Sequence, residues 1–169
     1  YIDATFESPF TLANGSNSVC IAANGAGGGC AGVLAQPGDK IPGIPALTLK
    51  LRAGYALTPK TRIRASVQAQ GSQYARGDEN NRDVQGALPG YVLLNADFLY
   101  ALAEHWSLFA RVDNVLDRHY SGFAVLGQNV FTADGQGFDP SGSSWRSEQF
   151  RAVGAPRGAW IGVRWRATP

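Results

Sequence analysis

Residues 47–72, with the sequence LTLKLRAGYALTPKTRIRASVQAQGS, decide the fold of this chain. In the first half, the odd-numbered positions from Leu47 to Leu57 are apolar, and most of the even-numbered positions are polar or small. After the segment Thr58-Pro59-Lys60, the alternation resumes at Ile63. A period of two residues is typical of a β-strand with two different faces. The stretch therefore predicts a β-hairpin.

The two predicted strands are long for a globular protein, since each runs for about ten residues or more at roughly 3.3 Å per residue. A tilted strand that crosses a bilayer needs about that length. Charged residues make up 17% of the chain, against about 25% in a usual soluble domain. The net charge of +2 gives no reason to propose nucleic acid as a partner. No apolar run approaches the roughly 18 residues of a membrane helix, so strands would have to make any bilayer crossing.

The same alternation predicts further strands at residues 92–102, 106–113 and 159–165, and the end of a first strand at residues 1–7. Four apolar residues interrupt the pattern: Leu93, Leu99, Phe109 and Trp160. The segments without periodicity are predicted to be loops and span residues 8–43, 76–90 and 121–156. The fold class is therefore all-β, an antiparallel up-and-down meander of about six strands with its short turns at one end, as in outer-membrane barrels.

The predicted strands carry no charged residue on their apolar face. The opposite face is predicted to line a lumen and carries Lys50, Arg52, Arg62, Arg64, Asp97, Arg111, Asp113, Arg164 and Arg166. Aromatic residues near the short-turn end of the apolar face resemble an interfacial girdle and are Tyr55, Tyr100, Trp106 and Trp165. A soluble β-sandwich also alternates in this way, although its strands are usually shorter. Since bacterial membrane barrels start at about eight strands, further strands must come from elsewhere.

One segment near the last predicted long loop carries a family resemblance. Val112-Asp113-Asn114-Val115-Leu116-Asp117-Arg118-His119-Tyr120 resembles the penultimate-strand motif of TonB-dependent outer-membrane receptors. Two other stretches agree, Ile41-Pro42-Gly43-Ile44-Pro45 before a strand and Gly154-Ala155-Pro156-Arg157 before the final strand. Gly162, Val163 and Trp165 resemble the terminal signal read by the barrel-assembly machinery, although Arg166-Ala167-Thr168-Pro169 follow.

The resemblance implies a receptor barrel of 22 strands in the bacterial outer membrane, closed by a plug and supplied with energy through TonB. Its ligand would be scarce, such as a ferric siderophore, haem or cobalamin, and a ferric siderophore is the expectation here. We expect residues 1–169 to be the C-terminal part of such a barrel, without the plug domain. The chain opens in mid-pattern at Tyr1, which also favours a piece of a longer protein.

The predicted loop at residues 121–156 mixes aromatic residues with Arg and amide side chains, a composition that suits capture of an anionic chelate. The candidate ligand-binding residues are Tyr120, Phe123, Gln128, Asn129, Phe131, Trp145, Arg146 and Arg151. The aromatic residues, Phe150 included, would equally serve to pack the loop against its neighbours. Both interpretations stay open at the level of the sequence.

Cys20 and Cys30 share one predicted extracellular loop, where oxidising conditions favour a disulfide over two free thiols. Gly27, Gly29 and Gly32 match a dinucleotide-binding pattern, but no strand precedes them and no helix follows, so we assign the match to chance.

Other candidate sites fail on spacing. The acidic segment that begins at Asp78 departs from EF-hand spacing at Arg82, so a solvated loop is the preferred interpretation over calcium binding. His105 and His119 have no partners at metal-ligand or triad spacing. The sequence therefore indicates no enzyme, no metal site and no cofactor.

Overall fold

The computed structural model describes residues 1–13, 16–19, 21–22, 30–132, 134–142 and 145–167. The chain forms two compact units. Unit 1 comprises Tyr1–Ala46, Ser72–Pro89 and Ser121–Val153, and unit 2 comprises Leu47–Gly71, Gly90–Tyr120 and Gly154–Pro169. In the part of the chain that the structure describes, no helix has both the length and the hydropathy needed to span a membrane.

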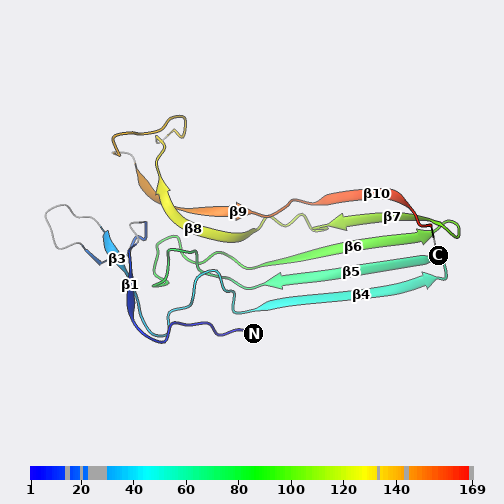
Figure 1. The fold of residues 1–169 in the computed structure, drawn as a ribbon, viewed down its shortest axis with the longest axis horizontal. Coiled ribbons are helices and arrows are strands. Elements are labelled where there is room, and N and C mark those ends of the chain that lie inside the picture. Colours follow the sequence, from blue (N-terminus) through cyan, green and yellow to red (C-terminus); the bar gives the residue numbers. More distant parts are fainter. Residues whose placement is uncertain (14–15, 20, 23–29, 133, 143–144, 168–169) are drawn as a thin grey trace. The chain divides into compact units, whose positions relative to one another are not determined.

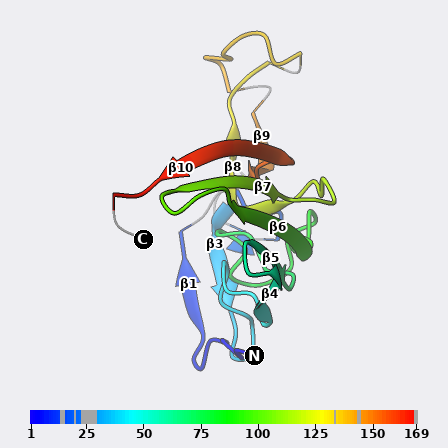
Figure 2. The same cartoon turned by 90° about the vertical axis from the view of Figure 1, so that its right-hand side faces the viewer.

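Unit 2 is built on an antiparallel five-stranded sheet in the order β10-β7-β6-β5-β4 (Figure 1). Its strands are β4 (Thr48–Thr58), β5 (Thr61–Gln70), β6 (Tyr91–Ala101), β7 (Trp106–Asp113) and β10 (Gly158–Trp165). Figure 2 shows the sheet with β10 at one edge and β4 at the other. The predicted hairpin and the three predicted strands that follow it are therefore confirmed, and so is their antiparallel order.

The register of this sheet places all the apolar positions of the alternation on one side, which we call the apolar face. Leu51 is paired with Val67, and Val67 is in turn paired with Leu94 on the next strand. The described strands carry no charged residue on this face. Leu49 is 43% exposed and Ile161 is 75% exposed, whereas the inner face of a β-sandwich buries such side chains. The structure therefore favours the barrel interpretation over the sandwich.

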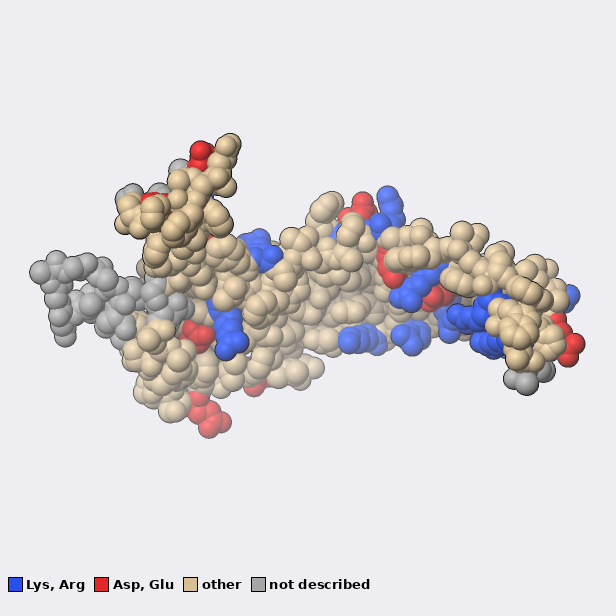
Figure 3. All heavy atoms as spheres, turned by 45° about the horizontal axis from the view of Figure 1, so that its top comes forward, with Lys and Arg blue, Asp and Glu red and all other residues tan. Residues whose placement is uncertain are grey.

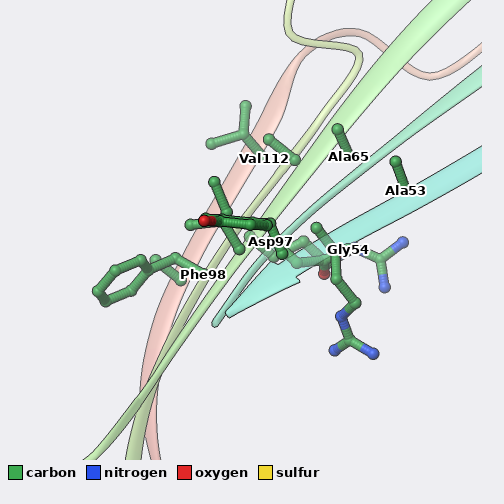
Figure 4. A pocket seen from close by; sticks show the side chains of 12 residues that line it. Ala53, Gly54, Ala65, Asp97, Phe98 and Val112 are labelled. Atoms are coloured by element: carbon green, nitrogen blue, oxygen red, sulfur yellow. The ribbon is translucent and has the colours of Figure 1, made fainter. Parts of the chain in front are cut away.

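A row of small residues crosses the apolar face and leaves a shallow hollow of about 640 Å³. The row follows the register through Ala53, Ala65, Ala96, Val112 and Ala159. Figure 4 shows that the Ala and Val side chains it labels project from one side of the sheet, while the nitrogen-tipped side chains leave from the other. The two faces thus differ in both chemistry and relief.

Two of the residues that interrupt the alternation, Phe109 and Trp160, lie on the opposite side, which we call the charged face. Phe109 is paired with Gly162, and a Cβ on Gly162 would lie 2.7 Å from Cζ of the Phe109 ring. A Cβ on Gly158 would lie 2.6 Å from the Trp160 ring. Aromatic rings shield the exposed backbone of strand glycines and fill the space that a side chain would occupy. These two interruptions therefore reflect packing against glycine and leave the register intact.

Unit 1 contains a small antiparallel sheet in the order β1-β3-β2, formed by β1 (Phe10–Leu12), β2 (Ile21–Ala22) and β3 (Cys30–Ala35). The prediction of a loop over residues 8–43 is therefore wrong over these three strands. The strand predicted at residues 1–7 is also wrong, since the described pairing there is an isolated bridge between Thr5 and Lys40. β1 and β2 are too short to show an alternation, so pattern reasoning misses them. The predicted Cys20–Cys30 disulfide lies outside the residues and side chains that the structure describes.

Unit 1 also contains a hairpin, formed by β8 (Ser121–Asn129) and β9 (Arg146–Val153), within the span predicted to be a loop. That prediction is therefore wrong over both strands. Ala124 and Leu126 are buried in a cluster with Ala75 and Leu88. Apart from these two positions, most of the hairpin is exposed or half-buried, so its sequence shows little of the regular alternation that a half-buried strand displays.

The acidic segment that begins at Asp78 is folded inward, so its interpretation as a solvated loop is wrong. Asp78 is 1% exposed, and its Oδ1 accepts hydrogen bonds from the backbone N–H groups of Arg82 at 2.9 Å and Asp83 at 3.0 Å. The side-chain amide of Asn17, far away in sequence, donates to Oδ1 of Asn80 at 3.1 Å. The second oxygen of Asp78, Oδ2, is buried without a hydrogen-bond partner among the described residues.

We predict that Asp78→Asn stabilises this segment increasingly as the pH rises. Burial, and to a smaller extent the nearby Asp83 carboxylate, raise the pKa of Asp78 above its ordinary value of 3.8. A carboxyl with a raised folded-state pKa stabilises the fold below its unfolded pKa, and this contribution is lost as the pH rises through the folded value. Asn keeps the Oδ1 acceptor and stays neutral throughout.

Limited proteolysis of the intact protein at several pH values from about 4 to 8 measures this effect. The ratio of the wild-type to the Asp78→Asn cleavage rate within residues 76–90 should increase with pH. A ratio that does not change with pH would contradict the prediction.

Candidate functional site

The charged face of the unit 2 sheet is the first candidate site. The register places on it all the strand residues predicted to line a lumen, namely Lys50, Arg52, Arg62, Arg64, Asp97, Arg111, Asp113 and Arg164. Arg64 is paired with Asp97, and Asp97 with Arg111, so one carboxylate lies between two guanidinium groups across three strands. Figure 3 shows blue side chains gathered along the sheet with red ones between them. That these residues face a lumen remains a prediction.

Cations outnumber carboxylates on this face. Arg111 Nε donates to Asp113 Oδ1 at 2.9 Å. This ion pair joins two residues on the same face of β7, two positions apart in the sequence. The remaining ion pairs among the described residues lie elsewhere in the chain. The Arg164 guanidinium lies 5.6 Å from the centroid of the Phe109 ring, a distance suited to a cation–π contact. The charged face therefore presents an excess of positive charge.

The β8–β9 hairpin is the second candidate site, and its register divides the predicted ligand-binding residues between two faces. Phe123, Asn129 and Arg146 lie on one face, together with Phe150. Gln128 and Arg151 lie on the other face, the one that carries the buried Ala124 and Leu126. The hairpin therefore brings together an aromatic and Arg group on one face but not the full predicted set.

The polar residues of this hairpin are partly engaged by one another. Arg146 forms an ion pair with Glu148, and Asn129 Nδ2 donates to the same carboxylate at 2.9 Å. Arg151 Nε donates to Gln149 Oε1 at 2.8 Å. The Phe123 and Phe150 side chains are exposed. A ligand that binds here would thus meet exposed rings beside a guanidinium that is already paired.

Phe131 and Trp145 lie outside the two strands of the hairpin, in the segment that joins them. Phe131 forms an isolated bridge with Phe138. The Trp145 indole Nε1 donates to the carbonyl of Asp139 at 2.8 Å. Both rings are exposed, which leaves binding and packing roles open for them.

Tyr120 has a different position from the other predicted ligand-binding residues, because it belongs to unit 2. Its ring centroid lies 4.4 Å from that of Tyr91. A Cβ on Gly154 would lie 2.1 Å from the Tyr120 ring, so the ring lies directly against that glycine. These contacts indicate a packing role for Tyr120.

Hydrogen bonds join the segment after β7 to the segment before β10, and the residues that make them are those of the family resemblance. Asn114 has a positive φ of 51°, which Asn tolerates better than most residues. Its Nδ2 donates to the carbonyls of Arg118 at 3.0 Å and Ala155 at 3.1 Å, and its Oδ1 accepts from the Arg118 N–H at 2.9 Å. The Arg157 N–H donates to Asp117 Oδ1 at 2.9 Å. We call this set of contacts, with the Tyr120–Gly154 contact, the clasp.

Sequence reasoning found the clasp residues but missed their function. Asn114 and Asp117 came from one resembling stretch, and Gly154, Ala155 and Arg157 from another, with no indication that the two stretches touch. The positive φ values at Asn114 and Asp117 are the physical signal, since Asn and Asp are enriched at such positions. An Asn and an Asp three residues apart directly after a strand could have indicated a tight structured turn.

The residues predicted to form the assembly signal lie on both faces of the edge strand β10. Val163 and Trp165 are on the apolar face, and Trp165 is paired with Trp106 of β7. Both are more than half exposed. Gly162 is on the charged face beneath the Phe109 ring. Whether the assembly machinery reads these residues stays a prediction.

Among the described residues, no group of three or more His, Cys, Asp or Glu side chains is placed to hold a metal ion. The backbone carbonyl of His105 accepts a hydrogen bond from the Arg166 N–H at 2.9 Å, which joins the chain after β10 to a short turn of the sheet.

Comparison with known proteins identifies the family. The model for the β-barrel of TonB-dependent receptor-like proteins matches residues 10–115. The chain belongs to the TonB-dependent receptor β-barrel family. This match confirms the predicted resemblance and agrees with the all-β antiparallel fold. No curated protein sequence matches the chain.

One similar solved structure is the siderophore receptor PiuA from Acinetobacter baumannii. The alignment has a TM-score of 0.57 and 16% sequence identity, and it covers 76% of this chain and 15% of the PiuA chain. At this identity the likeness concerns the fold. The chain thus spans less than one sixth of the length of the PiuA chain.

We predict that Asn114→Ala destabilises the folded barrel by about 3 kcal/mol, because it removes the side-chain hydrogen bonds of the clasp and places Ala at positive φ. Asn114→Gly should cost less, since glycine adopts the positive φ without strain although it loses the same hydrogen bonds. Denaturant unfolding of the intact receptor, refolded in detergent, measures both changes. If Asn114→Ala unfolded at the wild-type denaturant concentration, the clasp would have no stabilising role.

Proposed function

We propose that the chain forms the C-terminal part of the barrel wall of an outer-membrane receptor that takes up a scarce ligand with energy delivered through TonB. The observation that carries this proposal is the segregation of charge on the unit 2 sheet, where every strand presents an uncharged face and the opposite face carries the cations. Lipid suits the first face and a water-filled lumen suits the second. The family match supports the same assignment.

The ligand that we propose is a ferric siderophore. Support comes from the fold shared with PiuA, which is a siderophore receptor, and from the excess of positive charge on the charged face. An anionic iron chelate would be attracted by such a surface. This family consists of receptors rather than enzymes, so we propose transport without chemical conversion of the ligand.

The proposed partners follow from membership of the family. They are outer-membrane lipid against the apolar face, the receptor's own plug within the barrel, TonB as the energy source, and the barrel-assembly machinery during insertion. Val163 and Trp165 on the exposed apolar side of β10 are the proposed contacts for assembly.

Within the hairpin, Phe123, Phe150 and Arg146 form the group best suited to bind ligand, because they share one face and both rings are exposed. Gln128 and Arg151 lie on the other face. For Tyr120, the packing against Tyr91 and Gly154 supports a structural role more than direct binding.

We predict that Arg146→Ala in the intact receptor weakens binding of its ferric siderophore at least tenfold. A charge-assisted contact to an anion contributes roughly 1.5–3 kcal/mol, and the change also leaves the Glu148 carboxylate without its cation beside the anionic ligand. Arg151→Ala should have a smaller effect, since Arg151 lies on the opposite face of the hairpin. Binding is measured on whole cells with a panel of radiolabelled ferric siderophores, and uptake is compared with and without TonB.

Lys60→Ala, in the short turn at the end of β4, is the matched control and should leave affinity unchanged. If the Arg146→Ala, Arg151→Ala double variant bound the siderophore as the wild type does, the hairpin would not be the binding site. Uptake that did not depend on TonB would contradict the transport proposal as a whole.

A further inference from the structure

A hollow on the charged face is lined by four arginines. It has a volume of about 500 Å³ and lies near the short-turn end of the unit 2 sheet. Arg62 and Arg64 of β5 contribute two of the guanidinium groups, and Arg164 and Arg166 contribute the other two from β10 and its C-terminal extension. The residues that line the hollow include no carboxylate.

Small and apolar residues line the hollow together with the arginines. Gly54 has no side chain, and a Cβ at this position would lie 3.2 Å from Cγ of Arg64. Leu99 of β6 also lines the hollow. An apolar floor with polar groups around it is the usual composition of a small-molecule site, and 500 Å³ falls within the range of such sites.

The four guanidinium groups are not neutralised within the described structure. None of them takes part in the ion pairs of the described residues, in which Arg111, Arg146, Arg157 and Lys40 are the cations. Arg164 lies over the Phe109 ring, which orients its guanidinium without cancelling its charge. The closest acidic neighbour by register is Asp97, which is paired with both Arg64 and Arg111. It does not line this hollow, but it lines an adjacent one together with Arg64, Arg164 and Arg111.

We infer that this hollow binds a small multivalent oxyanion, with carboxylate or phosphate groups, at the short-turn end of the barrel lumen. The inference rests on the proposed function, because the charged face encloses a lumen only in a closed barrel. Guanidinium groups bind carboxylates and phosphates in a bidentate manner, and several around one hollow select for more than one negative charge. The site lies on the sheet itself and is separate from the binding residues proposed on the hairpin.

Titration of citrate and pyrophosphate into the intact receptor in detergent, at low salt, tests this inference by calorimetry, with glucose as the uncharged control. We expect both anions to bind and glucose not to bind. The Arg62→Gln, Arg164→Gln double variant should weaken anion binding at least tenfold. Arg62→Lys with Arg164→Lys should have an intermediate effect, since it keeps the charge and loses the bidentate geometry.

Lys50→Gln with Arg52→Gln is the matched control, because it removes two cations from the same face outside this hollow. It should change the affinity less than twofold. Equal weakening in both double variants would overturn the inference in favour of diffuse attraction. Absence of anion binding to the wild type would also overturn it, and would indicate that carboxylates from the rest of the receptor, such as the plug, neutralise the arginines.

Heat-modifiable mobility on gels separates failure of this inference from failure of the proposed function. A receptor that shows this mobility and takes up its ligand but binds neither anion retains the proposed function and lacks the site. The same assay shows that each variant has folded.

Discussion

A single register runs through five strands of this protein, and it separates charge from hydrocarbon-like surface along their full length. Each pairing keeps Leu51, Val67 and Leu94 on one side and Arg52, Arg64 and Asp97 on the other. A slip of one residue in any strand would exchange its two faces. In a bilayer the exchange would cost roughly 2–4 kcal/mol for each Arg or Lys near the midplane, so the membrane itself would hold the register.

Several local features of unit 2 maintain that register. The clasp fixes the end of β7 against the start of β10, although a long segment of unit 1 separates them in sequence. The Phe109 ring fills the place of a side chain at Gly162 on the neighbouring strand, which gives that pair a specific fit. These features act on β10, which pairs with β7 alone in the described sheet.

The period of two residues predicted the strands of unit 2 well, because these strands are long and one face of each is almost entirely apolar. The short strands of unit 1 contain too few residues for a period of two to emerge, as at Ile21–Ala22. The β8–β9 hairpin was missed because its burial is confined to Ala124 and Leu126, which meet residues far away in sequence. The buried Asp78 also accepts a hydrogen bond from Asn17, a tertiary contact that no local pattern reports. For the candidate site, the common face of the charged residues was predictable, whereas the split of the hairpin residues required the register of two unpredicted strands.

The environment of the apolar face is the most direct test of this account. Spin labels at Leu51 and Ile161, and for comparison at Ser66 on the charged face, can be placed singly in the intact receptor after Cys20 and Cys30 are replaced by Ser. In lipid vesicles, relaxation by oxygen should dominate at the first two positions, and relaxation by a water-soluble nickel complex should dominate at the third. Equal access of the nickel complex to all three labels would contradict the account.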